Sequence, residues 1–300
     1  MPATQPSLLS PEMVSRLSSV VVRARHLVEG TLSGIHKSPH RGSSVEFLEH
    51  KRYTPGDDIR NVDWKLLARS DRLYVKQFED ETNLRATLVV DSSASMGYGP
   101  EGRSKHRFAS MAAAAFAYML LSQSDAVGLL SQKDERRIYV PPRSDWSHFQ
   151  AVAGALDDLE AQGENAWLEH LIELAGSLRK RGMFVLFTDL LVEREQALQA
   201  LRLLRDRRHE VLLFHVLHPW ELEFPFSDPR VFTDPEERGR QILADPESVR
   251  ESYLKRVREL CSFFREEATG LEVDYHLLPS DSRLEEALVL YLAQREAQMG

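Results

Sequence analysis

The sequence predicts an α/β protein built on a doubly wound, mostly parallel sheet. Short apolar runs rich in β-branched residues, which suit buried parallel strands, alternate with longer segments of helical periodicity. Two of these runs, at 84–90 and 183–188, are each followed directly by an aspartate. This alternation is typical of a sheet that is covered by helices on both faces.

Residues 1–30 are predicted to form an N-terminal helix. Ser10 followed by Pro11 is a helix-start signal, apolar residues then recur at helical spacing, and Gly30 ends the pattern. Residues 31–83 have no regular periodicity beyond short strand-like pieces such as 72–78, so we expect a β-rich, irregular subdomain. Its alternating Arg and acidic residues are either solvated ion pairs or a docking surface.

Residues 84–300 are predicted to form the α/β domain, and an aromatic-rich lobe is inserted at about 219–269 with a hairpin at 230–243. The segment 105–124 is apolar nearly all round, which is typical of a buried helix. Strands are expected at 84–90, 126–130, 137–140, 182–188, 210–217 and 271–277, the third antiparallel to the second. Helices are expected at 105–124, 149–159, 168–181, 194–207, 246–269 and 283–294.

Composition places the chain among ordinary globular proteins, with 300 residues, 42% hydrophobic residues and 28% charged residues. The net charge of −8 argues against a broad nucleic-acid-binding surface. The single cysteine, Cys261, excludes an intrachain disulfide. We see no signal peptide, and the apolar run 108–121 is shorter than the roughly 20 residues that span a bilayer. We therefore expect a cytoplasmic protein without membrane insertion.

Polar side chains follow the apolar run 84–90 at the point where ligand sites of open α/β sheets lie. Asp91, Ser93 and Ser95 alternate, so one turn could direct their oxygens to a single point. Asp189 follows a second parallel strand and is expected at the same edge. This oxygen set suits Mg²⁺ or Mn²⁺, with a position left open for an acidic residue of a protein ligand. The alternative is that Asp91 and the serines cap the following loop and helix.

The string Asp91-x-Ser93-x-Ser95 after an apolar strand resembles the metal-ion-dependent adhesion site of von Willebrand factor A domains. The resemblance implies a von Willebrand factor A or Rossmann-like fold. Its pattern adds a threonine from a loop between the two strands, where this chain has Gly163-Glu164-Asn165-Ala166. Either Asn165 supplies a carbonyl oxygen in its place or that ligand is missing.

The segment upstream of this string resembles the bacterial family catalogued as domain of unknown function 58, from about residue 34 to about residue 96. The resemblance implies an adaptor, because members are usually encoded beside MoxR-type AAA+ ATPases. The segment is then a candidate partner-binding surface. Its matching residues are Arg41, Glu46, Arg52, Tyr53, Asp57, Asp58, Arg60, Asp63, Trp64, Lys65, Arg69 and Lys76.

Other chemistries fit the sequence less well. Residues 97–102 match G-x-G-x-x-G, but a polar segment separates them from the strand, so we expect no nicotinamide or flavin cofactor. A Walker A lysine motif is missing, which argues against a bound nucleotide. We expect a non-enzymatic protein-interaction module. The alternative is a divalent-metal-dependent hydrolase, a phosphatase or nuclease, in which Asp57, Asp58 and Asp63 join Asp91.

Overall fold

The computed structural model describes residues 47–52, 66, 74–78, 84–133, 136–236 and 240–299. The chain divides into two compact units, one at 39–83 and the other containing 84–300. In the smaller unit, β1 (Phe47–Arg52) pairs antiparallel with β2 (Tyr74–Phe78). The helix expected at 1–30 lies outside the described residues, and the expected domain boundaries stay a prediction.

The larger unit confirms the predicted mixed α/β architecture with a mostly parallel central sheet. Its six strands lie in the order β10-β7-β6-β3-β4-β5, and only the pairing of β5 with β4 is antiparallel. The strands are β3 (Arg85–Val90), β4 (Ala126–Lys133), β5 (Arg136–Arg143), β6 (Met183–Thr188), β7 (Glu210–Leu217) and β10 (Asp274–Pro279).

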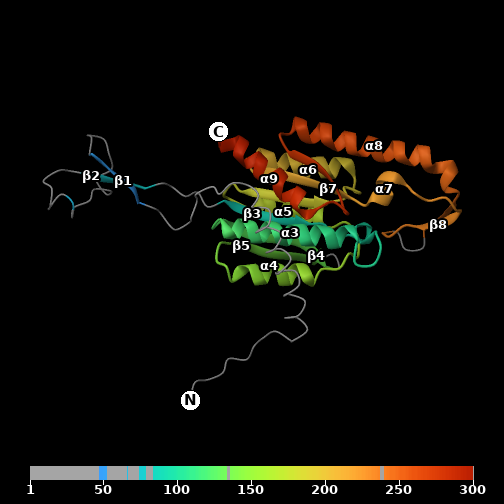
Figure 1. Ribbon diagram of the computed structural model, residues 1–300, viewed down its shortest axis with the longest axis horizontal. Helices are drawn as coiled ribbons and strands as arrows, with labels where there is room; N and C mark the ends of the chain where they lie inside the picture. Colours follow the sequence, from blue (N-terminus) through green and yellow to red (C-terminus); the bar gives the residue numbers. More distant parts are fainter. Residues whose placement is uncertain are drawn as a thin grey trace, which may run out of the picture. The chain divides into compact units, whose positions relative to one another are not determined.

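Helices cover both faces of this sheet (Figure 1). One apolar core joins the sheet to the first group of helices, α3 (Lys105–Ser122), α4 (His148–Asp157) and α9 (Leu284–Met299). A second core joins the opposite face to α5 (Trp167–Ser177), α6 (Arg194–Asp206) and α8 (Pro246–Gly270). Both faces of the central strands are therefore buried, which explains why those strands read as continuous apolar runs.

The strand order reverses at β3. The chain leaves β3 through α3 to reach β4 on one side, whereas β6 and β7 follow on the other side. Val90 pairs with Phe187 at the carboxyl ends of β3 and β6. A crevice at such a switch point is the usual ligand position in open α/β sheets.

The inserted lobe consists of α7 (Pro219–Glu223) and a separate hairpin of β8 (Arg230–Thr233) and β9 (Gln241–Ala244), close to the hairpin expected at 230–243. An aromatic cluster holds it to α8. Phe224 stacks on Phe232 with ring centroids 5.8 Å apart, and Phe224 lies 4.5 Å from the Tyr253 ring.

The last strand differs from its predicted bounds. It starts at Asp274 rather than at residue 271, because Glu272 adopts a positive φ of 54° and turns the chain after α8. Among the described residues, no helix combines the length and the apolar character that crossing a membrane requires.

Candidate functional site

Asp91 and Asp189 meet at the carboxyl ends of β3 and β6, the switch-point position that we term the crevice although both side chains are buried. The Asp91 N–H donates to the Phe187 carbonyl at 3.0 Å, which extends the pairing of the two strands by one residue. The Thr188 hydroxyl donates to Asp91 Oδ2 at 2.8 Å. Both aspartates are fully buried. The parallel strands thus place two carboxylates at one edge, as the sequence pattern predicts.

The Asp91 carboxyl is held in an unfavourable environment for a negative charge. Its burial, and then the nearby charge of Asp189, raise the pKa of Asp91 from 3.8 to about 7. Hydrogen bonds from Ser93 and Thr188 lower the pKa and only partly offset this rise. A cation beside these carboxylates would relieve the repulsion between them.

The loop after β3 directs two hydroxyls to the same place. The Ser93 N–H donates to Asp91 Oδ1 at 2.9 Å, and the Ser93 and Ser95 hydroxyl oxygens are 3.1 Å apart. The Ser93 side chain does not cap the short 3₁₀-helix η2 (Ala94–Gly97), and α3 is capped by Ser104. Asp91 therefore caps the loop that follows β3, as the alternative interpretation expects, whereas the hydroxyls of Ser93 and Ser95 cap neither helix.

Asn165 lies on a loop that packs against the serine loop. The Ala94 N–H donates to the Gly163 carbonyl at 3.1 Å, which joins the two loops. Asn165 Nδ2 donates to the Leu191 carbonyl at 3.1 Å, two residues beyond Asp189. In the described part of the chain Asn165 Oδ1 is buried and accepts no hydrogen bond. This oxygen is therefore available to coordinate a cation or to accept a hydrogen bond from an N–H group.

Glu236, which follows β8 in the lobe, brings a further carboxylate to the site. Asn165 Nδ2 donates to its two oxygens at 2.8 and 3.0 Å. Burial raises the pKa of Glu236, hydrogen bonding from Ser95 lowers it, and the charge of Asp189 raises it. An acidic side chain from the lobe therefore faces the serine and asparagine side chains of the crevice.

Lys105, the first residue of α3, is the built-in cation of the site. Its ammonium group is fully buried and lies 2.8 Å from both Asp189 Oδ2 and Glu221 Oε1 of α7. Burial alone would lower the pKa of Lys105, but the two carboxylates outweigh burial and raise the pKa above 10.5. The ion pairs join the sheet edge to the lobe.

His215 of β7 contacts the backbone of Asp189. Its Nε2 lies 2.9 Å from the Asp189 carbonyl oxygen and its Nδ1 lies 2.7 Å from the Tyr275 hydroxyl. Burial lowers the pKa of His215 to about 4, so the ring is neutral at pH 7. The neutral ring adds no positive charge to the site.

The structure places Asp91, Ser93, Ser95 and Asp189 together at the carboxyl ends of β3 and β6. Asn165 lies on the neighbouring loop, where its side chain contacts the Leu191 carbonyl and Glu236. Of the predicted docking surface, Arg52 lies in β1 and Lys76 in β2, where Lys76 pairs with His50. The others lie outside the described residues: Arg41, Glu46, Tyr53, Asp57, Asp58, Arg60, Asp63, Trp64, Lys65 and Arg69.

Three charged residues of the site were missed from the sequence: Lys105, Glu221 and Glu236. Lys105 could have been found, because a lysine that begins a helix predicted to be buried all round requires an anionic partner. Glu221 and Glu236 gave no such signal. Both lie in the lobe, and no local sequence pattern predicts that the lobe crosses the edge of the sheet.

A divalent cation fits this donor set in part. Hydroxyl, carboxylate and amide oxygens of the crevice are hard donors of the kind that Mg²⁺ and Mn²⁺ take. Asn165 Oδ1 is unpartnered, as a waiting ligand would be. However, Asp189 Oδ2 already binds the Lys105 ammonium. Over the residues that the structure describes, no three His, Cys, Asp or Glu side chains gather closely enough to hold a metal ion by themselves.

A family model described as "Protein of unknown function DUF58" matches residues 49–261 of this chain. An uncharacterised protein of Mycobacterium tuberculosis is 29% identical over 259 residues, which are 82% of this chain and 78% of that protein. An uncharacterised protein of Mycobacterium bovis is similar to the same extent.

Two solved structures are similar at low sequence identity. The conserved hypothetical protein BatB from Bacteroides thetaiotaomicron is 13% identical with a TM-score of 0.46, covering 72% of this chain and 99% of that chain. An aerotolerance-related membrane protein from Bacteroides fragilis is 15% identical with a TM-score of 0.46, covering 72% of this chain and 100% of that chain.

Proposed function

The chain belongs to the DUF58 family, whose function is unknown, and from this premise we propose that it is a non-enzymatic protein-interaction module. Its crevice at the ends of β3 and β6 binds an acidic side chain of a partner protein. The partner that the family resemblance implies is a MoxR-type AAA+ ATPase, for which this chain acts as an adaptor in the cytoplasm.

One observation carries this proposal: the crevice already holds a carboxylate within the same chain. Glu236 from the lobe is bound by Asn165 Nδ2 and faces Ser95. The groups that bind the carboxylate of Glu236 can bind the carboxylate of another Asp or Glu in the same place. Charge-assisted hydrogen bonds of this kind are about twice as strong as neutral ones.

A divalent cation is the second part of the proposal. Ser93, Ser95, Asp91 and the Asn165 amide oxygen would hold Mg²⁺ or Mn²⁺, and the ion would supply positive charge to the partner's carboxylate. Lys105 supplies a fixed positive charge beside Asp189 in either case. Because the Lys105 ammonium already balances the charge of Asp189, the divalent ion would have fewer negative charges to balance.

Replacing both Ser93 and Ser95 by alanine is expected to weaken Mg²⁺ binding at least about tenfold, because it removes two hydroxyl ligands without changing the charge. Isothermal titration calorimetry measures the change. Ser92→Ala is the matched control, since its hydroxyl is 3.1 Å from that of Ser131 and takes no part in the crevice. Equal affinity of the double variant and the control would contradict a serine-bound cation.

Replacing Glu236 by glutamine is expected to strengthen binding of the partner's carboxylate about tenfold, because the internal carboxylate competes at high effective concentration. Biolayer interferometry with a purified MoxR-type AAA+ ATPase measures the affinity. Glu223→Gln, on the exposed face of α7, is the control. A variant at Glu236 that binds no more tightly than the control would contradict competition for the crevice.

The hydrolase alternative has one observation in its favour, the pKa of Asp91 near neutrality, which suits a general base. Against it, Asp91 is fully buried and both of its oxygens accept hydrogen bonds. A phosphatase and nuclease screen with Mg²⁺ and Mn²⁺ tests the alternative. Turnover that is lost in Asp91→Asn would overturn the interaction-module proposal.

A further inference from the structure

A row of exposed aromatic side chains borders the crevice on the side of the lobe. Tyr98 is 37% exposed and Trp220 is 39% exposed, and the centroids of their rings are 6.3 Å apart. The ring of Phe226, which is half-buried, lies 6.1 Å from that of Trp220. We call these three residues the aromatic strip. Apolar side chains that are exposed singly are common, whereas exposed side chains that contact one another indicate a binding surface.

The strip is positioned by the same contacts that build the crevice. The Tyr98 N–H donates to the Ser95 carbonyl at 3.1 Å, and Trp220 directly precedes Glu221, which binds Lys105. The Lys105 ammonium lies 5.9 Å from the Tyr98 ring centroid. The two exposed rings are therefore held in place before a partner binds, so little conformational freedom is lost on binding.

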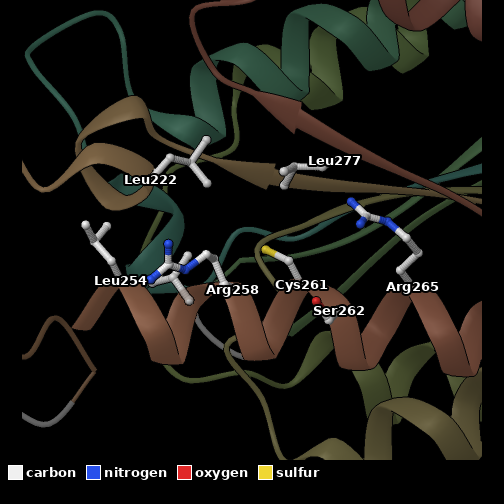
Figure 2. A pocket seen from close by; sticks show the side chains of 8 residues that line it. Leu222, Leu254, Arg258, Cys261, Ser262, Arg265 and Leu277 are labelled. Carbon is white, nitrogen blue, oxygen red and sulfur yellow. The ribbon is translucent and has the colours of Figure 1, made fainter. Parts of the chain in front are cut away.

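The helix α7 has two different sides. Leu222 lines a pocket of about 310 Å³ together with Leu254 of α8 and Leu277 of β10 (Figure 2). Trp220 precedes Leu222 by two residues and therefore lies on the opposite side of the helix. The side of Leu222 faces α8 and β10, whereas the side of Trp220 carries the exposed ring beside Tyr98.

A guanidinium group lies against the strip. Arg230 of β8 packs over the Phe226 ring, with its Cζ 4.5 Å from the ring centroid, and its Nε donates to the Asp228 carbonyl at 3.3 Å. In the part of the chain that the structure describes, no carboxylate lies within the 4.0 Å ion-pair limit of Arg230. A guanidinium that is stacked on a ring can still pair with a carboxylate through its terminal nitrogens.

We propose that the aromatic strip and Arg230 bind a segment of a partner protein in which an acidic residue lies next to a large apolar residue. The carboxylate pairs with Arg230, and the apolar side chain covers the exposed faces of Tyr98 and Trp220. Tyr, Trp and Arg are the residue types that most often carry the binding energy of protein interfaces. The inference rests on the proposed interaction function, but it requires neither a bound cation nor the displacement of Glu236.

Synthetic peptides test the two features of this segment separately. A fluorescein-labelled peptide in which glutamate alternates with leucine is the probe, and fluorescence anisotropy measures its affinity. One comparison peptide has glutamine in place of each glutamate, and the other has alanine in place of each leucine. The unchanged protein is expected to bind the probe at least about tenfold more tightly than either comparison peptide, because each of these lacks one of the two contacts.

Variants of the surface are each expected to lose one preference. Trp220→Ala is expected to weaken binding of the probe about tenfold and to remove the preference for leucine over alanine, while the preference for glutamate over glutamine remains. Arg230→Gln is expected to have the reverse effect on the two preferences. A general loss of folding would not separate them. Trp146→Ala and Arg256→Ala, at exposed positions outside the strip, are the matched controls and are expected to bind as the unchanged protein does.

The proposal is overturned if the unchanged protein does not bind the probe, or binds it no more tightly than it binds either comparison peptide. Binding that Trp220→Ala and Arg230→Gln leave unchanged would also overturn it. So would a dimer, measured by size-exclusion chromatography with light scattering, that Trp220→Ala dissociates, because a second copy would then cover the strip. The crevice is judged independently, by the variants at Ser93, Ser95 and Glu236, whose measurements do not involve the peptides.

Discussion

Replacing Lys105 by methionine is expected to lower the free energy of unfolding by about 3–5 kcal/mol, because it leaves the buried Asp189 and the partly buried Glu221 without a cation. The Lys105 ammonium lies 2.8 Å from both Asp189 and Glu221, and Asp189 is fully buried. Methionine keeps most of the side-chain volume, so the loss comes from charge rather than from a cavity. Urea unfolding followed by circular dichroism measures the change.

A second variant distinguishes the missing cation from simple misfolding. Adding Asp189→Asn to Lys105→Met removes one of the unpaired charges and is expected to recover part of the lost stability, which a double-mutant cycle quantifies. Lys255→Met is the control, since Lys255 is exposed and its contact with Glu259 is 3.9 Å long. We expect a change within about 0.5 kcal/mol there. If Lys105→Met cost no more than this control, the lysine would not be the cation that holds the site together.

The sheet could be predicted because its strands are buried on both faces. Such strands appear in the sequence as uninterrupted apolar runs, and the helices between them are recognised by their helical periodicity. Neither prediction requires knowledge of contacts between distant residues. The start of β10 was misplaced because Leu271 and Val273 are apolar, although the positive φ of Glu272 keeps them out of the strand. Apolar pattern alone does not show where a turn ends.

The site was predictable only where topology fixes it. Asp91 and Asp189 each end a parallel strand, so their meeting follows from the fold class. The electrostatics were not predictable, because Glu221 and Glu236 arrive from the lobe and Lys105 from the start of α3. These three residues decide whether the crevice requires an added cation, and they come together only through the packing of the lobe.

Acidification is expected to destabilise the protein through His106, and the sign follows from its buried position in α3. Burial, and then the charge of Arg107, lower the pKa of His106 from 6.5 to about 4. Between these values the unfolded chain binds the proton and the folded chain does not, so stability falls as pH falls from 6.5 to 4. The loss is about 3 kcal/mol, at 1.36 kcal/mol per pKa unit.

Comparison with His106→Gln isolates this effect, because Asp91 acts in the opposite direction. The raised pKa of Asp91 means that the folded chain binds a proton more tightly than the unfolded chain, which adds stability as pH falls from about 7 to 3.8. The difference in unfolding free energy between the His106→Gln variant and the unchanged protein cancels that contribution. We expect this difference to move in favour of the variant by about 3 kcal/mol between pH 7 and pH 4.

Ser110→Ala, a buried and non-titrating change in the same helix, is the control. The difference in unfolding free energy between this control and the unchanged protein is expected to stay constant with pH. If the difference for His106→Gln were equally constant with pH, the folded chain would bind a proton at His106 as readily as the unfolded chain does, and the prediction would be wrong.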